Sequence, residues 1–429
     1  MKVLKQIAAA IASALIVAAA APSVDEGDVA AMRHYVEKNR SYSPAARAEA
    51  MRRLERLPAL VSDPARFELE AAAIAALADN GHSVLFPPQW TTRYPRSPVR
   101  LGLFADGLFV IAAPPGHRAL QGREVVAING RPWRSIRDAY SRYQGGEQAF
   151  RDQFVTYFME TPALLAAAGL GEDRDRLSLT LADANGRPVE TIVPAQLAPL
   201  EGDEAVLGRP LPLEAVALVR TGALPLYLED ADQPLRLRRV PELDAAYIQL
   251  KSTSGEGLRP FLARTLAELR ADPPRNIILD LRFNLGGDLT LSRDFAQALP
   301  GLAQGGRLYA VTSGRTFSAA ISTLGYLKQA AGDRLTIVGE PIGDRLEFWA
   351  EGDMVNLPGL GAMLLYATER HNYMTGCPEA DCHANVRDHP IRVASLQPDV
   401  AAPLHFADYV AGRDPAMEAI ARLIREGRD

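Results

Sequence analysis

The sequence is poor in lysine and cysteine and has few long apolar runs. Each of these shortages excludes some functions or some classes of protein. Lysine occurs only at positions 2, 5, 38, 251 and 328, and arginine supplies the rest of the 47 basic side chains. The formal charge of −5 disfavours nucleic acid or an anionic membrane surface as the partner. The sequence contains no low-complexity tract of the kind that predicts disorder, and an apolar fraction of 48% is ordinary for a globular protein. A chain of 429 residues is expected to form two or three domains.

The longest apolar run stands near the N-terminus. Lys2 and Lys5 precede an apolar stretch over 7–21 that ends in four alanines. A basic start, a short apolar segment and a small-residue exit predict a secretory signal peptide over residues 1–21, and hence a periplasmic or secreted protein. The alternative is a membrane anchor, but a spanning helix needs about 20 apolar residues. No later segment is long and apolar enough, so we expect no stable membrane span after cleavage.

Only two cysteines are present, Cys377 and Cys382. In an oxidising compartment a pair this close can close a small loop, so we expect a structural disulfide. A metal site is the alternative, but it needs further ligands, and neighbouring side chains such as Asp381 and His383 rarely converge on one ion. The other histidines lack the spacing of a metal-binding helix. We therefore expect neither a metal nor an organic cofactor.

After the predicted signal peptide, the composition and spacing of the residues predict first helices and then strands. Residues 25–90 are predicted to form a helical region, because their alanine, leucine, arginine and glutamate content and their apolar spacing are helical. Residues 95–200 turn to short β-like runs, with hairpin signals at Asn129-Gly130 and Asn185-Gly186. A helical insert at 136–168 interrupts them. These patterns predict a small β-rich domain after the helices.

The second half of the chain has a different pattern. A proline- and leucine-rich connection covers 201–240, and from 241 to 429 strands alternate with helices. Strands are expected over 246–250, 276–281, 308–311, 335–338 and 362–367, and helices over 259–270, 292–298 and 318–331. This alternation predicts a layered α/β domain. In the β-rich part, the segment 120–130 resembles the strand and turn of PDZ domains. That resemblance implies a groove that binds a peptide end or an extended segment by β-augmentation; the alternative is a β-rich domain without a ligand.

Two segments of the last domain have the features of an active site. In the first, 280–288, a buried strand leads into a turn with Gly286 and Gly287, where backbone N–H groups can approach a ligand oxygen. In the second, 311–320, a strand enters a tight turn and Ser318 opens a helix. A hydroxyl there lies at the positive end of the helix, beside amides that are free to bind an oxyanion. The alternative for Ser318 is a simple N-cap, a role that serine favours.

The two segments together resemble a known family. The chain contains Asp-x-Arg-x-Asn-x-Gly-Gly-Asp, then Thr-Phe-Ser-Ala-Ala, then Gly339-Glu340-Pro341. This series of motifs resembles that of the tail-specific (C-terminal processing) serine peptidases, which include tricorn core proteases and interphotoreceptor retinoid-binding proteins. The resemblance implies a crotonase-like ββα catalytic domain behind a helical region and a PDZ-like domain. It also implies cleavage of peptides or proteins through an acyl-serine at Ser318. The oxyanion hole would come from the amides of Ala319 and of Gly287 or Gly286.

A serine nucleophile needs a group that takes its proton. In tail-specific proteases a lysine after Gly-Glu-Pro does so, but residues 343–345 read Gly-Asp-Arg, and arginine does not release its proton. Lys328 follows Ser318 on the same predicted helix, about 15 Å away by helical rise, and is excluded. The tricorn-like branch uses a histidine before the PDZ segment, and Gly81-His82-Ser83 resembles that motif. The resemblance implies His82 as general base; the alternative is a histidine that caps the preceding helix or lies in a loop.

The acid that would orient His82 is harder to place. Asp388 is the candidate and Glu369 its rival, although such residues are more often solvated surface charges. The sequence thus predicts an exported serine-type peptidase. A catalytically inactive peptide- or ligand-binding protein with the same fold is the main alternative, because a fold does not guarantee its chemistry. An acyl-CoA enzyme of the crotonase type fits the fold but not the export signal or the PDZ-like segment.

Overall fold

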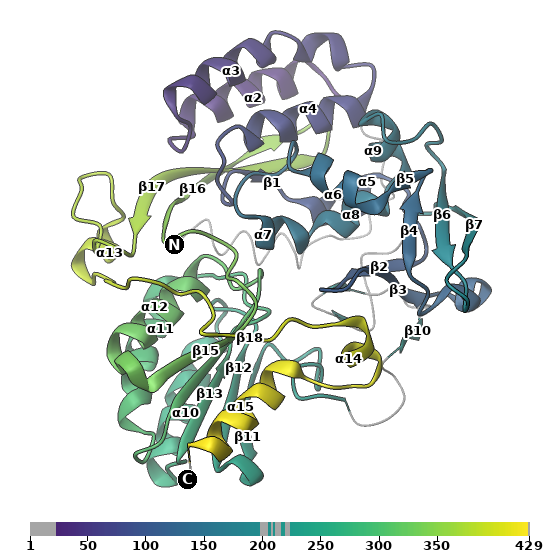
Figure 1. Ribbon diagram of the computed structural model, residues 1–429. Coiled ribbons are helices and arrows are strands. Elements are labelled where there is room, and N and C mark those ends of the chain that lie inside the picture. The colour runs from purple at the N-terminus through teal and green to yellow at the C-terminus, as the bar shows by residue number, and fades with distance from the viewer. Residues whose placement is uncertain (1–22, 198–204, 207–208, 211–215, 219–223, 428–429) are drawn as a thin grey trace.

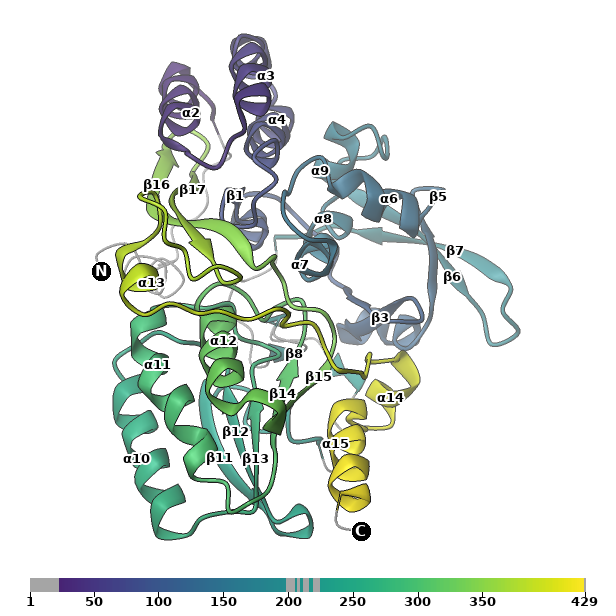
Figure 2. The same cartoon turned by 60° about the vertical axis from the view of Figure 1, so that its left-hand side comes forward.

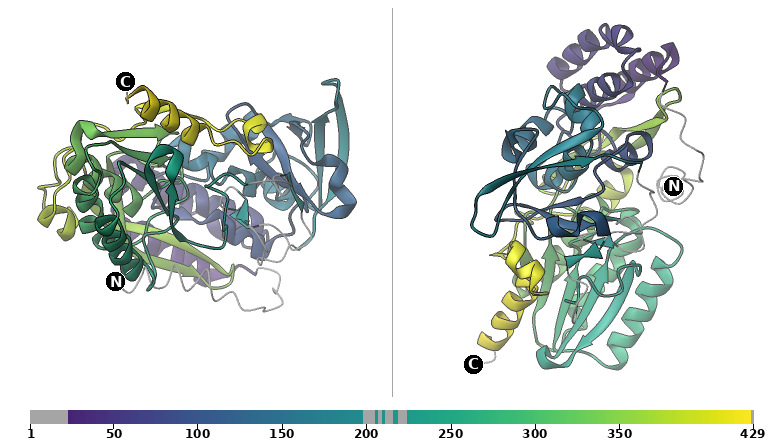
Figure 3. Two further views of the ribbon diagram at one scale, coloured as in Figure 1. Left: turned by 90° about the horizontal axis from the view of Figure 1, so that it is seen from below. Right: turned by 90° about the vertical axis from the view of Figure 1, so that its right-hand side faces the viewer.

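The structure is a computed structural model that describes residues 23–197, 205–206, 209–210, 216–218 and 224–427 (Figure 1). The predicted signal segment lies outside the described residues, as does much of the predicted connection. No helix in the described part is long and apolar enough to cross a membrane. The fold is mixed α/β: the N-terminal helices and the C-terminal α/β domain lie at opposite ends, with a β-rich part between them (Figure 3).

The C-terminal α/β domain is built on a six-stranded sheet in the order β11-β12-β13-β14-β15-β18. The first pair is antiparallel and the other pairs are parallel. The strands are β11 (Leu235–Val240), β12 (Ala245–Leu250), β13 (Asn276–Asp280), β14 (Leu308–Thr312), β15 (Leu335–Gly339) and β18 (Val400–Ala401). Every residue of β12, β13 and β14 is buried, as expected of parallel strands covered on both faces.

Helices cover both faces of this sheet (Figure 2). Side chains alternate along each strand: Ile248 packs toward one core and its neighbour Tyr247 toward the other. The first core lies under three helices and the second under one. The helices are α10 (Leu258–Ala271), α11 (Leu289–Ala298) and α12 (Ala319–Ala331) on one face and α15 (Pro415–Glu426) on the other.

A long hairpin leaves the α/β domain and joins the N-terminal helices. Its strands, β16 (Glu347–Leu357) and β17 (Ala362–Asn372), form a sheet with β1 (Val84–Leu85) in the order β1-β17-β16. The buried carboxylate of Asp28 accepts the amides of Gly359 and Leu360 at the hairpin turn, both at 3.1 Å. The helices of this end are α2 (Glu26–Lys38), α3 (Pro44–Leu54) and α4 (Pro64–Ala76). The N-terminal region and the hairpin are therefore one packed layer.

In the described residues, the sheets of the β-rich part have the orders β5-β4-β6-β7 and β10-β3-β2, and β8 (Ala205–Val206) pairs with β9 (Arg209–Pro210). The turn between β4 and β5 has Asn129 at φ 51° and Gly130 at φ 70°, the conformation that the Asn-Gly hairpin signal predicts. The strands are β2 (Arg100–Leu103), β3 (Leu108–Ala113), β4 (Val125–Ile128), β5 (Arg131–Pro132), β6 (Arg176–Ala182), β7 (Pro188–Pro194) and β10 (Val216–Ala217). The predicted helical insert consists of the short helices α6 (Trp133–Tyr140), α7 (Gln148–Asp152), α8 (Val155–Met159) and α9 (Pro162–Ala167).

Candidate active site

Ser318 stands at the sharp turn between β14 and α12. Its φ of 53° and ψ of −125° lie in a region that non-glycine residues rarely adopt, at a cost of about 1–3 kcal/mol. Its side chain makes no capping hydrogen bond to α12, which argues against the N-cap alternative. Two hydrogen bonds hold the turn in place, from Thr316 Oγ1 to the Leu281 carbonyl (3.0 Å) and from the Phe317 amide to the Asn284 carbonyl (3.0 Å). A strained serine between a strand and a helix is the arrangement of a nucleophile elbow.

The glycine turn packs directly against Ser318. A Cβ added to Gly286 would lie 2.6 Å from the Ser318 Cβ and 2.9 Å from the Ala319 amide nitrogen. The buried Asn284 accepts the Gly286 N–H at 2.8 Å, and Thr253 binds the turn on its other side through its own amide and carbonyl. Only glycine fits at this position, because a side chain would enter the space of the serine.

Two amides near Ser318 remain available for a ligand. Within the described residues, the N–H groups of Ala319 and Gly287 donate to no protein acceptor, whereas that of Gly286 is held by Asn284. Sequence reasoning left Gly286 and Gly287 as alternatives for the second oxyanion donor. The hydrogen bond to Asn284 favours Gly287.

His82 lies in the loop between α4 and β1, stacked between two phenylalanine rings. Its ring is 4.3 Å from that of Phe317 and 5.3 Å from that of Phe348, measured between centroids. Because Phe317 directly precedes Ser318, this stacking brings the histidine loop to the serine turn. Gly81 permits the approach, since a Cβ there would lie 2.8 Å from the Phe317 ring.

The carboxylate that faces His82 belongs to Asp344. Its Oδ2 lies 3.6 Å from His82 Nδ1, and the two side chains are 2% and 16% exposed. Among the described residues, neither that oxygen nor either nitrogen of the His82 ring has a hydrogen-bond partner. The neighbouring Gly343 amide binds the Thr316 carbonyl at 3.0 Å, and Arg345 pairs with Asp79 at 2.9 Å. The segment 343–345 thus connects the serine turn to the histidine loop.

The structure does not place Asp388 or Glu369 against His82. Asp388 is exposed at the end of α13 (Ala384–Asp388), in a shallow pocket with Arg293 and Tyr326. The Glu369 carboxylate lies 3.9 Å from His383. Sequence reasoning missed Asp344 although it examined the same tripeptide, because it looked there for a lysine base and not for an acid.

Comparison with known proteins identifies the fold. No protein-family model and no curated protein matches the sequence. Mature CPAF complexed with lactacystin aligns over 93% of this chain and 97% of its own, with a TM-score of 0.56 and 12% identity. A second structure of mature CPAF gives a TM-score of 0.53 at 12% identity, over 93% and 95% of the two chains. The chain has the CPAF fold. A photosystem II D1 C-terminal processing protease aligns more loosely, over 92% and 96% at a TM-score of 0.39 and 14% identity.

Within this CPAF-like fold, a buried ionic network anchors the start of the glycine turn. Arg282 pairs with Asp280 at 2.9 Å and also with both oxygens of Asp414 at 2.9 and 3.0 Å. Tyr247 donates to Asp280 at 2.6 Å. Since Asp414 also caps α15, the network ties that helix to the end of β13.

The two cysteines form a disulfide, Cys377–Cys382. Their sulfur atoms are therefore not thiolates that could bind a metal, although Glu379 lies beside them. The bonded pair closes a short loop after β17.

Proposed function

We propose that this protein is an exported serine-type peptidase that hydrolyses peptide bonds through an acyl-enzyme on Ser318. The observation that carries the proposal is the strained, uncapped serine at the tip of α12, packed against a glycine turn with two free amides nearby. His82 supplies the base, and Asp344 takes the orienting role in place of Asp388. The shared fold with CPAF supports the proposal.

Each group has a defined step in this mechanism. Ser318 Oγ attacks the carbonyl carbon of the peptide bond while His82 takes the hydroxyl proton. Because Nδ1 of the ring faces Asp344, Nε2 is the nitrogen left for the serine. The amides of Ala319 and Gly287 bind the oxyanion, and the proton passes to the leaving amine. A water molecule, deprotonated by His82, then hydrolyses the ester and restores the serine.

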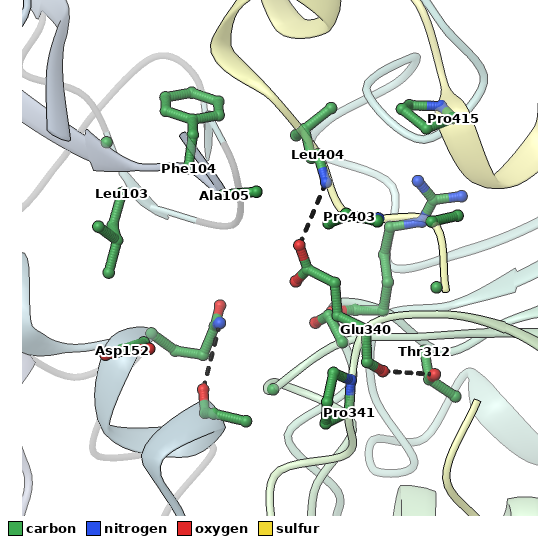
Figure 4. Close-up of a pocket in the computed structure, with 18 of the residues that line it drawn as sticks. Leu103, Phe104, Ala105, Asp152, Thr312, Glu340, Pro341, Pro403, Leu404 and Pro415 are labelled. Atoms are coloured by element: carbon green, nitrogen blue, oxygen red, sulfur yellow. Dashed lines mark hydrogen bonds between the residues drawn. The ribbon is translucent and has the colours of Figure 1, made fainter. Parts of the chain in front are cut away.

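A groove between the β-rich part and the α/β domain is lined by Ser313 and Gly314 of the segment that leads to Ser318, although Ser318 and His82 are not among its lining residues. A cavity of about 550 Å³ lies between the end of β2 and the segment around Glu340 (Figure 4). Leu103, Phe104 and Ala105 line one side, and Leu404 lines the other. In the described residues β2 is an edge strand of its sheet. The amide of the buried Leu101 on this strand already donates to Glu160 at 2.8 Å, whereas Leu103 at its end is partly exposed. We propose that the PDZ-like part binds an extended segment of the substrate at the Leu103 end of this edge by β-augmentation.

Export is part of the proposal. It rests on the basic and apolar N-terminal pattern, and the disulfide in the α/β domain supports it because such bonds persist in oxidising compartments. The periplasm or the exterior of the cell is the proposed location.

Ser318→Ala tests the nucleophile. The variant should lose labelling by a serine-reactive phosphonate and about a thousandfold or more of the turnover of a peptide mixture. Ser395→Ala, at an exposed serine, and Lys328→Ala are the controls and should keep both. Lactacystin, which is bound in the CPAF structure, should compete with the phosphonate for the wild-type protein. Equal labelling of Ser318→Ala and wild type rejects the assignment, and a wild-type protein that binds peptides but neither reacts nor cleaves is the inactive binding protein.

A further inference from the structure

A second group of titratable side chains lies beyond Phe348, outside the proposed catalytic residues. The Phe348 ring stacks on His82 and also on His371, 4.9 Å away, and His371 stacks on His383 at 5.5 Å. The carboxylate of Glu351 completes the group. One side-chain nitrogen or oxygen from each of Glu351, His371 and His383 lies within 4.8 Å of the others.

Backbone pairing brings the segments of the two histidines together, and Glu351 belongs to β16, the strand that pairs with β17. In the hairpin, β16 pairs with β17 so that Phe348 lies opposite His371. The disulfide loop returns alongside β17: the Arg370 amide donates to the Asp381 carbonyl (2.9 Å), and the His383 amide donates to the Arg370 carbonyl (3.0 Å). These two hydrogen bonds hold the loop beside β17, where the His383 ring lies parallel to that of His371, with 3° between their planes.

Each of the two histidines has one buried ring nitrogen without a hydrogen-bond partner among the described residues. The His371 side chain is 3% exposed, and its Nε2 makes no hydrogen bond to any described residue, although Glu351 Oε1 lies 3.6 Å away. Its Nδ1 is 3.0 Å from the Tyr373 hydroxyl, which in turn lies 2.6 Å from Ser322 Oγ. Nδ1 of His383 is also buried without a partner in the described part of the chain. Buried polar nitrogens are normally satisfied, so these point to a missing ligand.

We propose that Glu351, His371 and His383 bind a divalent transition-metal ion, for which Zn²⁺ is the test species. Two imidazoles and a carboxylate are a donor set that such ions prefer. Ligands about 2.0–2.1 Å from zinc lie about 3.3 Å apart at a tetrahedral angle, close to the 3.6 Å between His371 and Glu351. Two ligand atoms that lie as far as 4.8 Å apart must come within about 4.2 Å of each other to bind one ion. Rotation of the partly exposed Glu351 and His383 side chains allows this movement.

The surroundings of His371 support this assignment. A metal-binding histidine usually donates its second N–H to a fixed acceptor, and here the Tyr373 hydroxyl, itself bound to Ser322, takes that place. With Nδ1–H donating to Tyr373, the lone pair of Nε2 points to the ion. The ion would join β16, β17 and the disulfide loop, behind the phenylalanine that packs on His82.

The experiment measures metal binding directly. Full-length mature protein is stripped with a chelator and titrated with Zn²⁺ by calorimetry, and the bound metal is counted by mass spectrometry after gel filtration. We expect one Zn²⁺ per chain. His383→Ala and Glu351→Gln, at partly exposed positions, should each weaken binding about 100-fold or more, and Tyr373→Phe about 10- to 100-fold. His389→Ala, at an exposed histidine, should bind as wild type does.

The outcomes separate this site from adventitious binding and from the peptidase proposal. Less than stoichiometric binding by the wild type overturns the site, as does equal affinity in the wild type, His383→Ala and Glu351→Gln. Thermal unfolding of the stripped variants confirms that each is folded, and only folded variants are compared. The same titration in Ser318→Ala should give the wild-type affinity, because no step of binding uses the serine.

Discussion

Replacing Asp344 by asparagine removes the charge that faces His82 and keeps the shape of the side chain. Oδ1 of Asp344 accepts the Arg345 amide at 2.9 Å, a hydrogen bond that asparagine can also make. Oδ2, 3.6 Å from His82 Nδ1, is the atom that changes. Asp344→Asn therefore tests the charge with little disturbance of the 343–345 segment.

The expected effect follows from Coulomb's law. When His82 takes the serine proton, a positive ring forms 3.6 Å from the buried carboxylate. At an effective dielectric constant of about 20, two unit charges at that distance attract by about 4 to 5 kcal/mol. Since about 1.4 kcal/mol is a factor of ten in rate, kcat should fall about a thousandfold. KM should change little, because Asp344 acts through His82 and not on the substrate.

The assay is steady-state cleavage of a fluorogenic peptide chosen from those that the wild type turns over. Asp388→Asn is the matched control, and this exposed carboxylate should leave kcat within about twofold of wild type, as surface substitutions usually do. Thermal unfolding should show both variants folded. A kcat for Asp344→Asn within tenfold of wild type would refute the pairing of Asp344 with His82, and so would an equal loss in Asp388→Asn.

Three further substitutions test other parts of the structure. Burial raises the pKa of the Glu340 carboxyl, because the folded protein favours its protonated form. The contribution of this group to the free energy of unfolding is therefore complete below the ordinary glutamate pKa, and it is lost as the pH rises through the raised value. Glu340→Gln should therefore raise Tm relative to wild type at pH 7 and not at pH 4; an equal shift at both would contradict this. Gly286→Ala should abolish phosphonate labelling and lower the free energy of unfolding in urea by about 2 kcal/mol or more. The alanine Cβ would lie 2.6 Å from the Ser318 Cβ, and the backbone φ of 103° at this position strains a non-glycine residue. Retained labelling would contradict the close packing of the glycine turn on Ser318. Replacing Cys377 and Cys382 together by alanine should lower the free energy of unfolding by about 2 kcal/mol, the loop-entropy contribution expected for so short a ring. It should also weaken Zn²⁺ binding, because the loop carries His383. An unchanged free energy of unfolding and an unchanged affinity would show that the disulfide contributes to neither.

Local pattern was sufficient to predict the elements whose own residues dictate their structure. The helix expected over 259–270 is α10, and the strand expected over 276–281 is β13, each within a residue of the predicted ends. Strand β16 was missed, because its middle contains Glu351 and Gly352, at φ 45° and 153°, in place of β-forming residues. Pairing with β17 and packing on α2 decide its structure, and local propensity does not record such contacts.

The same distinction applies to the sites. Ser318 and the glycine turn carry their geometry in adjacent residues, so the sequence pointed to both. Asp344 faces a histidine from the other end of the chain, and no spacing along the sequence could relate them. The histidines of the proposed metal site were dismissed for lack of a helical spacing, whereas strand pairing and a disulfide loop bring them together.

The sheet formed by β1, β17 and β16 has a consequence for how the protein can be divided. The loop that carries His82 leads straight into a strand whose only partners in the described chain come from the α/β domain. Cutting between the helical region and the rest would remove the base, and it would also expose the edge of β17 and the apolar face beneath α2. Neither fragment would be left with a complete hydrophobic layer. We therefore expect unfolding of the two ends to be a single cooperative event, and the proposed catalytic pair to form only when the chain is intact.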